Sequence, residues 1–599
     1  MTAAAQEIVD VLVAGSGAGA LATAVTAARH GLKVLVVEKD AVYGGTTARS
    51  GGVLWVPCNP GSREAGIEDS LEAARAYLEQ EAGPNFDPVR VDAFLQAGPE
   101  MVAFFERETA VRFVGVPEFS DYHPNSPGAR PGGRSILAAP YDAAELGEQV
   151  KRLRPPLREI TFVGMMFNAS QEVAHFFNCT RSLKSAIYVV RRLAQHAREM
   201  LVFGRAQRLT NGNALAARLA RSAFDLGIEI RTECPVVGLV HEGGAVRGVT
   251  VRHGGADRTV LARHAVVLGT GGFPQSPELR KQLFPHAPTG QEHFSPAPTT
   301  NTGDGWHLAT DAGGATEVRI PNVAAWIPVS LVQHRDGTRG VFPHLIDRYK
   351  PGIIAVVKSG KRFVNEADSY HDFGQALQRE CAGGPLQAWL IADHRALRRY
   401  GLGFAKPFPV PIGHLLRSGY LLRGRTPAEL ARKAGIDAAQ LERTIAQFNG
   451  PARSGLDPQF GKGSTAYNRY LGDHNHQPNP CVAPLDKGPY YAVRVVMGDL
   501  GTFAGIRTDA TSRVLDAQAR PVTGLYAVGN DALSVMGGAY PGGGITLGPA
   551  MTFGYLAGRH IASVAQGGDA HIQLRESQTL GGSLRPHALS QEISQGIRS

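Results

Sequence analysis

The sequence predicts an α/β fold in which one domain is split in the chain around another. Residues 8–52 combine an apolar run, a glycine-rich turn, a helical stretch and a second apolar run that ends at an acid. Strand and turn patterns of the same kind return at residues 205–275 and after residue 488. Between them, residues 314–487 contain long irregular stretches rich in proline and histidine. The 599-residue chain is too long for one compact core.

The first unit is a predicted strand, helix and strand. An apolar strand over Val9–Val13 ends at Gly15-Ser-Gly17-Ala-Gly19-Ala20, a helix follows over Leu21–His30, and the strand Val34–Val37 ends at Glu38. Glycines in such a turn let a pyrophosphate approach backbone N–H groups at a helix N-terminus, and the acid can accept both ribose hydroxyls. The unit therefore predicts a Rossmann-like domain that binds a dinucleotide.

A second glycine-rich strip, GGTTARSGG at residues 44–52, follows this unit directly. A mobile nicotinamide dinucleotide does not need such a strip, whereas a flavin that stays bound does, because the chain must run along its pyrophosphate and ring edge. FAD is therefore the predicted cofactor. The residues expected to bind it are Gly15, Gly17, Ala18, Gly19, Ala20, Glu38, Lys39, Gly44, Gly45, Thr46, Thr47, Ser50, Gly51, Gly52, Val237, Gly271, Gly272, Asp304, Gly529, Asn530, Gly544, Ile545, Thr546 and Leu547.

Four segments are expected along the chain. Residues 1–313 form the first part of the FAD-binding domain, with a basic insertion at about 100–208 and a buried strand that ends at Gly271 and Gly272. Residues 314–487 form an α+β catalytic domain that caps the flavin, with helical pieces at 374–381, 427–434 and 437–448. Residues 488–566 supply the second part of the FAD-binding domain and a final helix from Ile545. The polar, serine-rich residues 567–599 are predicted to be a disordered tail.

The composition is typical of a soluble enzyme, and a cytoplasmic location is expected. The sequence has no apolar run of about 18 residues that could span a bilayer, and its N-terminus lacks a signal peptide pattern. The five cysteines form neither a CxxC pair nor a CxxCH haem site. No metal site is proposed, and electrons that leave the flavin are expected to go to an external acceptor such as a quinone or an artificial dye.

The positive charge is concentrated in one segment. The chain carries a formal charge of +9, and residues 151–208 contain eleven lysines and arginines against three glutamates. We interpret this segment as a solvated insertion that covers the FAD-binding domain. Because apolar runs lie between the charges, peripheral contact with an anionic membrane surface is the alternative. Nucleic-acid binding is not expected, since no recognition motif accompanies the charge.

Five separated motifs, GGTTARSGG, GDG, KRFVNE, DLGTFAGIRTD and GLYAVGN, resemble in this order the flavoprotein superfamily of fumarate reductase and succinate dehydrogenase over residues 8–565. Three segments are similar to those of 3-ketosteroid Δ1-dehydrogenases: SDYHPNSPGARPGGR with Tyr122, RFVNEADSYHDFG with Tyr370, and GGAYPGGGITLGPA with Tyr540 and Gly544. Tyr370 stands in the stretch where fumarate reductases carry an arginine proton donor. The histidine that attaches flavin covalently in succinate dehydrogenases has no counterpart, so FAD is expected to be held non-covalently.

The resemblance implies that the chain introduces a C1–C2 double bond into a 3-ketosteroid. Tyr370 would take a proton from C2, with Tyr122 as a relay or activator, while C1 gives a hydride to flavin N5. The hydroxyl of Tyr540 and the N–H of Gly544 would hold the C3 carbonyl oxygen as negative charge develops. A free tyrosine has a pKa of about 10, so Tyr370 needs either a lowered pKa or a relay.

Two alternatives remain open. A 3-ketosteroid dehydrogenase acting at C4–C5, or another FAD-dependent desaturase or ene-reductase of a cyclic ketone, would keep the same fold. A flavin-binding protein without dehydrogenase activity would use the basic segment to bind a membrane or a partner. The presence of a tyrosine in each of the three motifs argues against the second alternative.

Overall fold

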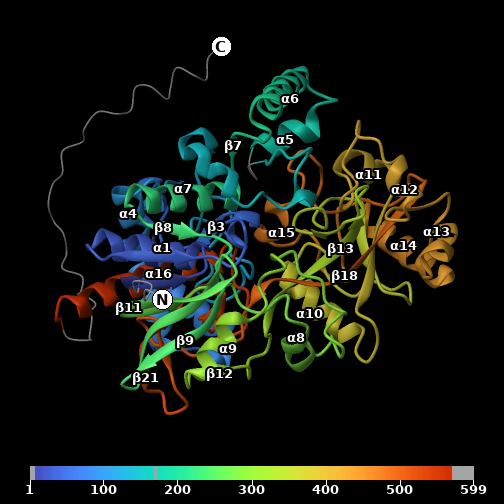
Figure 1. Ribbon diagram of the computed structural model, residues 1–599. Helices are drawn as coiled ribbons and strands as arrows, with labels where there is room; N and C mark the ends of the chain where they lie inside the picture. Colours follow the sequence, from blue (N-terminus) through green and yellow to red (C-terminus); the bar gives the residue numbers. More distant parts are fainter. Residues whose placement is uncertain (1–6, 168–170, 569–599) are drawn as a thin grey trace.

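An eight-stranded sheet forms the centre of the first body of the protein in a computed structural model that describes residues 7–167 and 171–568 (Figure 1). Five strands are parallel, in the order β21–β11–β1–β2–β8. These are β1 (Glu7–Ala14), β2 (Val34–Val37), β8 (Glu229–Arg231), β11 (Ala256–Leu268) and β21 (Pro521–Ala527). β9 (Val236–Glu242) and β10 (Ala245–His253) extend β11 antiparallel, and β20 (Arg513–Leu515) pairs with β21.

Both faces of this sheet are covered, as expected for parallel strands. Val11 and Val13 of β1 join a buried core with α1 (Ala18–Arg29), α7 (Asn211–Asp225) and α16 (Leu547–Ala565). Leu12 points to the other face, where the core includes side chains of β9, β10 and α9 (Asp304–Asp311). The layer expected to bind the cofactor is thus assembled from segments that lie far apart in the sequence.

Helices α1 and α16 cross in close contact because small residues line their interface. A Cβ on Gly554 would lie 2.5 Å from the carbonyl oxygen of Gly19, and a Cβ on Gly558 would lie 2.7 Å from Cβ of Thr26. Helix α1 begins at Ala18, three residues before the expected start, since Gly17 is its N-cap. The two helices therefore bring their N-termini to the same edge of the sheet.

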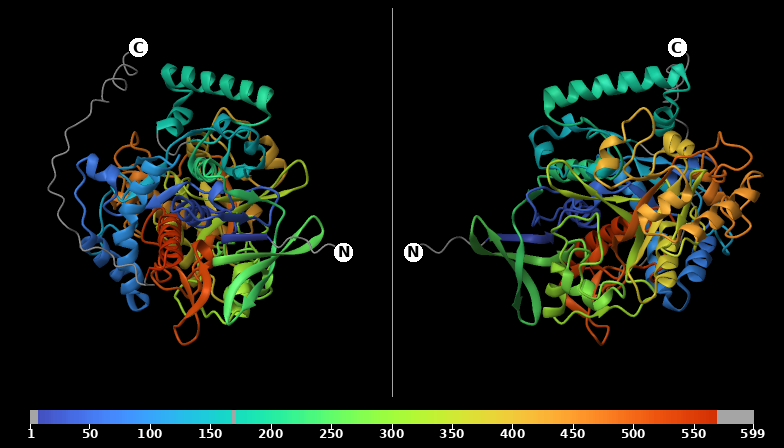
Figure 2. Two further views of the ribbon diagram at one scale, coloured as in Figure 1. Left: turned by 60° about the vertical axis from the view of Figure 1, so that its left-hand side comes forward. Right: turned by 90° about the vertical axis from the view of Figure 1, so that its right-hand side faces the viewer.

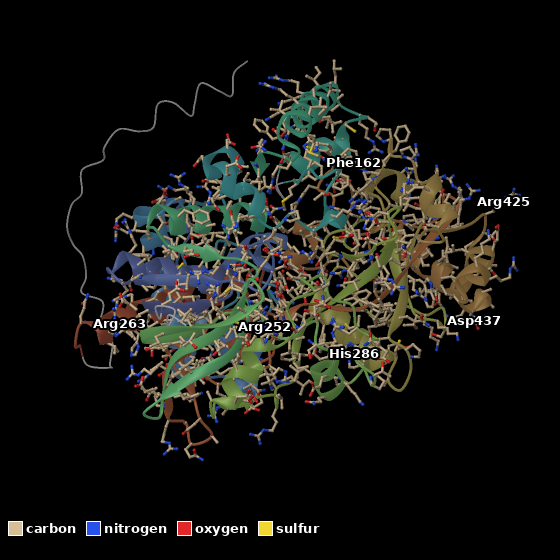
Figure 3. All side chains as sticks on the ribbon, viewed as in Figure 1. Phe162, Arg252, Arg263, His286, Arg425 and Asp437 are labelled. Carbon is tan, nitrogen blue, oxygen red and sulfur yellow. The ribbon has the colours of Figure 1, made fainter. Side chains whose placement is uncertain are left out.

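A six-stranded antiparallel sheet forms the second body, in the order β14–β13–β18–β16–β15 with β17 on β18. Its strands are β13 (Ala324–Gln333), β14 (Arg339–Pro343), β15 (Ile353–Val356), β16 (Gln387–Ala392), β17 (Leu422–Gly424) and β18 (Tyr490–Thr502). Figure 3 shows this body beside the first, with Arg425 and Asp437 on its far side and Arg263 of β11 on the opposite side of the molecule.

β18 differs from the expected division of the chain at residue 487. We expected residues 488–566 in the FAD-binding domain, but β18 pairs with β13, β16 and β17 of the second sheet. An apolar strand pattern predicts the strand but not its partners, because pairing depends on contacts that are distant in sequence. Of the expected tail, residues 569–599 lie outside the described residues.

The remaining elements surround the two sheets. The helices are α2 (Pro60–Glu64), α3 (Leu71–Ala82), α4 (Pro88–Glu108), α5 (Gln171–Asn178), α6 (Leu183–Phe203), α8 (Pro277–Leu283), α10 (Tyr370–Glu380), α11 (His394–Tyr400), α12 (Gly413–Arg417), α13 (Pro427–Ala434), α14 (Ala438–Ala452) and α15 (Ala466–Tyr470). Short 3-10 helices span Thr47–Arg49, Gly83–Asn85, Ala143–Arg152, Arg158–Ile160 and Gly529–Asp531. Three small sheets contain β3 (Val53–Trp55), β4 (Phe113–Gly115) and β5 (Ser135–Ala138); β6 (Tyr141–Asp142) and β7 (Arg208–Leu209); and β12 (Thr316–Glu317) and β19 (Gly505–Ile506).

Candidate active site

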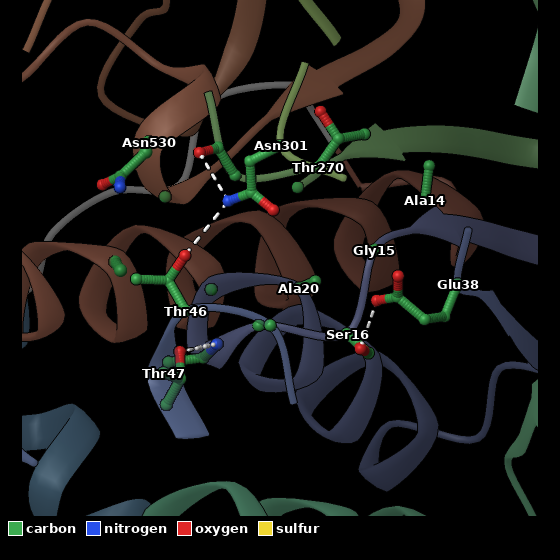
Figure 4. A pocket seen from close by; sticks show the side chains of 18 of the residues that line it. Ala14, Gly15, Ser16, Ala20, Glu38, Thr46, Thr47, Thr270, Asn301 and Asn530 are labelled. Atoms are coloured by element: carbon green, nitrogen blue, oxygen red, sulfur yellow. Dashed lines mark hydrogen bonds between the residues drawn. The ribbon is translucent and has the colours of Figure 1, made fainter. Parts of the chain in front are cut away.

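A pocket opens at the carboxyl ends of β1, β2 and β11, where the glycine-rich turn leads into α1 (Figure 4). Seventeen of the residues expected to bind the cofactor line it: Gly15, Gly17, Ala18, Gly19, Ala20, Glu38, Lys39, Gly45, Thr46, Thr47, Ser50, Gly271, Asp304, Gly529, Asn530, Thr546 and Leu547. The structure therefore gathers into one pocket residues from six separated segments of the chain.

Gly15 shows why this turn requires glycine. Its φ is +103°, and an added Cβ would lie 2.1 Å from the carbonyl oxygen of Gly269. Gly17 caps α1 without a side-chain hydrogen bond, and the N–H of Ala18 donates to Oγ1 of Thr47 at 2.9 Å, so the other N–H groups of the first turn are left for a ligand in the pocket. Thr546 likewise precedes α16 without capping it by its side chain. Two helix N-termini that face one pocket suit an anionic ligand such as a pyrophosphate.

Glu38 is buried at the end of β2 and is held in place by two donors. Its carboxylate accepts the Ser16 hydroxyl at 2.5 Å and the backbone N–H of Asp40 at 2.9 Å (Figure 4). Burial raises the pKa of Glu38, and these hydrogen bonds oppose that shift. The carboxylate is thus oriented toward the pocket, as an acceptor for ribose hydroxyls requires.

The pocket also includes polar residues that the sequence did not indicate. Asn301 donates from Nδ2 to Oγ1 of Thr46 at 3.0 Å (Figure 4), and Arg154 forms an ion pair with Asp40 at 2.6 Å. Lys39 pairs with Asp304 at 2.9 Å. Arg154 lies in the basic insertion, outside every motif, so only the folded chain brings it to the pocket.

Seven expected cofactor residues, Gly44, Gly51, Gly52, Gly272, Gly544, Ile545 and Val237, are not among those that line this pocket. Val237 is 42% exposed, while its neighbour Val236 lines the pocket, because successive side chains of a strand point to opposite faces. A contact of Val237 with the cofactor through its backbone stays a prediction. Gly52 supports the pocket from behind, since a Cβ there would lie 2.3 Å from the Asn211 carbonyl carbon at the start of α7.

Three expected tyrosines lie together between the two bodies. The hydroxyl oxygens of Tyr122 and Tyr370 are 3.0 Å apart. The Tyr540 ring stacks on that of Tyr122 with centroids 5.6 Å apart, and it meets the Tyr370 ring edge-on at 4.9 Å. All three side chains are buried. The motifs that carry them are therefore parts of one site.

Local structure fixes each of these phenols. Tyr370 is the first residue of α10, whose N-terminus is capped by the Ser369 hydroxyl accepting from the N–H of Asp372. The N–H of Tyr122 donates to the carbonyl of Pro541 at 2.9 Å, which joins its loop to the turn after Tyr540. The expected helix at 374–381 therefore begins earlier than predicted, and its start positions Tyr370.

Two further tyrosines extend this cluster, and no sequence motif marked either of them. The Tyr467 ring of α15 lies 4.4 Å from that of Tyr122. The hydroxyl oxygens of Tyr467 and Tyr349 are 2.7 Å apart, and Arg348 donates to Tyr349 at 3.3 Å. Packed phenols thus lead from Tyr370 to a buried guanidinium, with hydroxyl contacts at 3.0 Å between Tyr370 and Tyr122 and at 2.7 Å between Tyr467 and Tyr349, and a ring contact between Tyr122 and Tyr467.

Burial determines the protonation of these phenols. It raises the pKa values of Tyr370 and Tyr122 well above the usual value, and that of Tyr540 to about 12. Tyr540 is therefore a protonated hydrogen-bond donor at neutral pH. To act as a base, Tyr370 needs either a lowered pKa or a proton relay. Burial opposes a lowered pKa, whereas the neighbouring hydroxyl group of Tyr122 offers a relay.

The turn after Tyr540 depends on Gly544. Its φ is +101°, and an added Cβ would lie 2.6 Å from the carbonyl carbon of Leu54 and the nitrogen of Trp55. The carbonyl of Gly544 accepts from the N–H of Trp55 at 3.1 Å. β3 thus holds this turn directly before α16, as close backbone packing of glycine allows.

Two histidines adjoin the phenols and differ in charge. His123 lies between Glu81 and Asp372, with Nε2 3.0 Å from the Asp372 carboxylate. Although burial opposes it, hydrogen bonds to both carboxylates raise the pKa of His123 to about 10. His371 accepts the N–H of Trp326 through Nδ1, and burial lowers its pKa to about 4. At neutral pH His123 is therefore a paired cation and His371 is neutral.

A family model described as an FAD binding domain matches residues 10–547. The chain belongs to this flavoprotein family. It is 44% identical to 4-oxocyclohex-2-ene-1-carboxylate 5-dehydrogenase of Sinomonas cyclohexanicum, over 93% of this chain and 94% of the relative. It is 39% identical to 3-oxosteroid 1-dehydrogenase of Mycolicibacterium smegmatis, over 93% and 97% of the two chains.

The structure of this flavoprotein is similar to that of 3-ketosteroid delta1-dehydrogenase from Sterolibacterium denitrificans in complex with 1,4-androstadiene-3,17-dione. The TM-score is 0.86 at 36% identity, and the match covers 93% of this chain and 100% of the other. The predicted α/β fold with an FAD-binding domain is confirmed, as is FAD as the cofactor. The flavoprotein is an FAD-dependent oxidoreductase that acts on CH–CH donors, of the 3-oxosteroid dehydrogenase type.

Proposed function

We propose that this flavoprotein introduces a C1–C2 double bond into a neutral 3-ketosteroid. The meeting of Tyr122, Tyr370 and Tyr540 in one buried cluster is the observation that carries the proposal. It supplies both a pair of hydroxyl groups to accept a proton and a protonated phenol to bind a carbonyl. The 3-oxosteroid relatives at 38–39% identity support the same substrate class.

Tyr540 and Gly544 would bind the ketone. The hydroxyl of Tyr540 and the N–H of Gly544 donate to the carbonyl oxygen and stabilise the charge that develops there as the adjacent C–H bond breaks. Because the pKa of Tyr540 is about 12, its phenol keeps this proton at neutral pH. Binding at the carbonyl thus acidifies the neighbouring carbon.

Tyr370 would receive the proton from C2. Tyr122 would then relay a proton away from Tyr370 through the neighbouring hydroxyl groups. The electron pair of that C–H bond forms the new double bond, while C1 loses a hydride, so the substrate loses two hydrogens in total. Bound FAD supplies the hydride acceptor. The Tyr467, Tyr349 and Arg348 groups beyond Tyr122 would spread the negative charge that Tyr370 must bear before it can act as a base.

The charges around the phenols favour a neutral substrate. Arg348 donates to the carbonyls of His344, Glu366 and Asp368 as well as to Tyr349. His123 is held by two carboxylates. The N–H donors of Arg348 are thus used by neutral groups and His123 is paired with two carboxylates, so neither cation offers a donor to a substrate carboxylate beside the phenols, which would be buried there at a high desolvation cost.

A cyclic keto acid is the second candidate, because the relative at 44% identity acts on 4-oxocyclohex-2-ene-1-carboxylate by its name. The same phenols would serve that ring ketone, since the reaction at the carbonyl and its neighbouring carbon is the same. Only the group that binds the rest of the substrate would differ. The external electron acceptor, a quinone or an artificial dye, stays a prediction.

An anaerobic titration tests the proposal. The oxidised enzyme is mixed separately with 5α-androstane-3,17-dione, 4-androstene-3,17-dione and 4-oxocyclohexanecarboxylate, and loss of the flavin absorbance is recorded before the products are identified by mass and NMR. We expect bleaching with both steroids and a new C1–C2 double bond. A C4–C5 double bond in the product from the saturated steroid would show that the enzyme acts at C4–C5 instead. Bleaching by the keto acid alone would show that a cyclic keto acid is the substrate. No bleaching with any of the three compounds would show that the protein is not a dehydrogenase of these ketones.

A further inference from the structure

Helix α6 carries its apolar side chains on the outside. Leu183, Ile187, Val190 and Leu201 are 79%, 52%, 65% and 88% exposed. The face turned to the protein is instead largely polar, with Ser185, Val189, Arg192, His196 and Glu199 buried. A solvated insertion would show the opposite arrangement, since exposed helix faces are normally polar.

Polar contacts fix this orientation. Arg192 and Arg208 both pair with Glu172 of α5, at 3.3 and 3.2 Å. The Glu199 carboxylate accepts the N–H of Gln207 at 2.9 Å, and Nε2 of His196 lies 2.9 Å from the carbonyl oxygen of Val163. Rotating the helix to bury its apolar face would break these contacts. The outward direction of the apolar face is therefore built into the fold.

The outward face has a regular order. Leu183, Ile187, Val190, Ala194, Ala197 and Leu201 follow one another at alternating spacings of four and three, which places them on one line along the helix. Lys184, Arg191 and Arg198 repeat every seven residues directly beside this line, and all three are exposed. The face thus combines an apolar stripe with a basic border.

We propose that this face of α6 binds the surface of an anionic lipid bilayer. The apolar stripe would enter the boundary between headgroups and acyl chains, while Lys184, Arg191 and Arg198 would lie at the level of the lipid phosphates. Figures 1 and 2 show α6 at the upper edge of the molecule, above the remaining elements, so a flat surface can reach it. In the described part of the chain, no helix is long and apolar enough to cross a bilayer, so the helix lies on the membrane.

The charges disfavour a second copy of the chain as the occupant. A stripe with spacings of four and three can also pair two helices in a coiled coil. In an antiparallel pair, however, the basic borders of the two copies would face each other, which brings like charges together. In a parallel pair they would face Ala186, Leu193 and Met200, which offer no carboxylate. Lipid phosphates supply the countercharge that a second copy lacks.

The same hairpin of α5 and α6 contacts the elements that carry the tyrosine cluster. The ammonium group of Lys350 lies 5.7 Å from the centre of the Phe177 ring of α5 and donates to the carbonyls of Leu471 and Gly472, directly after α15 with Tyr467. The membrane-binding face would therefore sit above the substrate site. An apolar ketone could then enter the site directly from the bilayer. This last step rests on the proposed function, whereas membrane binding itself does not.

Co-sedimentation of the full-length flavoprotein with large unilamellar vesicles tests the binding itself. Vesicles of phosphatidylglycerol and phosphatidylcholine in equal amounts are compared with phosphatidylcholine alone. We expect sedimentation with the anionic vesicles only. Replacing Leu183, Ile187, Val190 and Leu201 by glutamine, or Lys184, Arg191 and Arg198 by glutamine, should each lower the partition coefficient roughly a hundredfold.

The matched control is the double variant Val89→Gln and Leu456→Gln, which changes exposed apolar side chains on other parts of the molecule. It should sediment like the wild type. Bound FAD, measured by absorbance, shows that each variant is folded. Wild-type protein that stays in solution with anionic vesicles, or stripe variants that sediment unchanged, would overturn the proposal. A lipid-free dimer in analytical ultracentrifugation that the stripe variants dissociate would overturn it in favour of self-association.

Discussion

The hydroxyl oxygens of Tyr122 and Tyr370 lie 3.0 Å apart, although 248 positions separate the two residues in the sequence. Tyr122 comes from a loop of the first body and Tyr370 from the first turn of α10 in the second. Their contact joins the two bodies at the candidate site. It also makes the proposed proton acceptor a pair rather than a single residue, so we expect changes at either position to affect the other.

The Tyr370→Phe variant should lose turnover while it retains FAD. The substitution removes the proposed proton acceptor but keeps the ring that packs against Tyr540 at 4.9 Å. Loss of a general base costs about 10²- to 10⁴-fold in rate. Stopped-flow reduction of the flavin by substrate measures this step, and the flavin absorbance reports cofactor content. Near-normal reduction would assign the base to another group.

The Tyr540→Phe variant should weaken both binding and turnover. Removing one donor to a developing oxyanion costs about 10²- to 10³-fold in rate. The ring, stacked on Tyr122, stays in place. Steady-state kinetics with substrate and an artificial acceptor provide kcat and KM. If both parameters stay at wild-type values, Tyr540 does not bind the carbonyl.

Tyr467→Phe tests the packed phenols beyond Tyr122. The variant keeps the ring that packs on Tyr122 at 4.4 Å but removes the hydroxyl group that lies 2.7 Å from that of Tyr349. A hydrogen bond to a charged group contributes about 1.5–3 kcal/mol, so kcat should fall roughly 10- to 100-fold. The pH dependence should move to higher pH, which a purely structural role would not produce. Tyr349→Phe should give a smaller effect in the same direction.

Activity should rise with pH through the neutral range. Burial raises the pKa of Tyr370, so its phenol is protonated at neutrality and only a small fraction of the phenols carries the charge of a base. The rate of flavin reduction should therefore increase by up to about tenfold per pH unit. Because the pKa of Tyr540 is about 12, the carbonyl donor is retained over this range. A rate that falls between pH 7 and 9 would contradict Tyr370 as the base.

Gly15→Ala should abolish FAD binding, and Gly31→Ala provides a matched control. Both glycines have positive φ, +103° and +88°, so alanine costs about 1 kcal/mol at either position from the backbone alone. Only at Gly15 would the new Cβ collide with backbone, at 2.1 Å from Gly269, whereas no atom lies within 4 Å at Gly31. Cofactor content and thermal unfolding measure the difference. Equal FAD content in the two variants would show that the turn tolerates a side chain.

Much of the cofactor pocket was predictable because its chemistry is encoded locally. Gly15, Gly17 and Glu38 lie within one strand, helix and strand, where backbone conformation and apolar periodicity act over a few residues. The three tyrosines were found through the motifs around them. Arg154 and Asn301 had no such signal, and their places in the pocket follow only from packing.

The sequence alone determined the α/β fold and FAD as the cofactor, because both depend on short segments with fixed spacing. Only the tertiary structure decided that β18 joins the second sheet, that Val236 rather than Val237 lines the pocket, and that Tyr467 extends the phenol chain. It also decided which face of α6 points outward. These features depend on which surfaces meet across hundreds of residues, and no local pattern specifies such contacts.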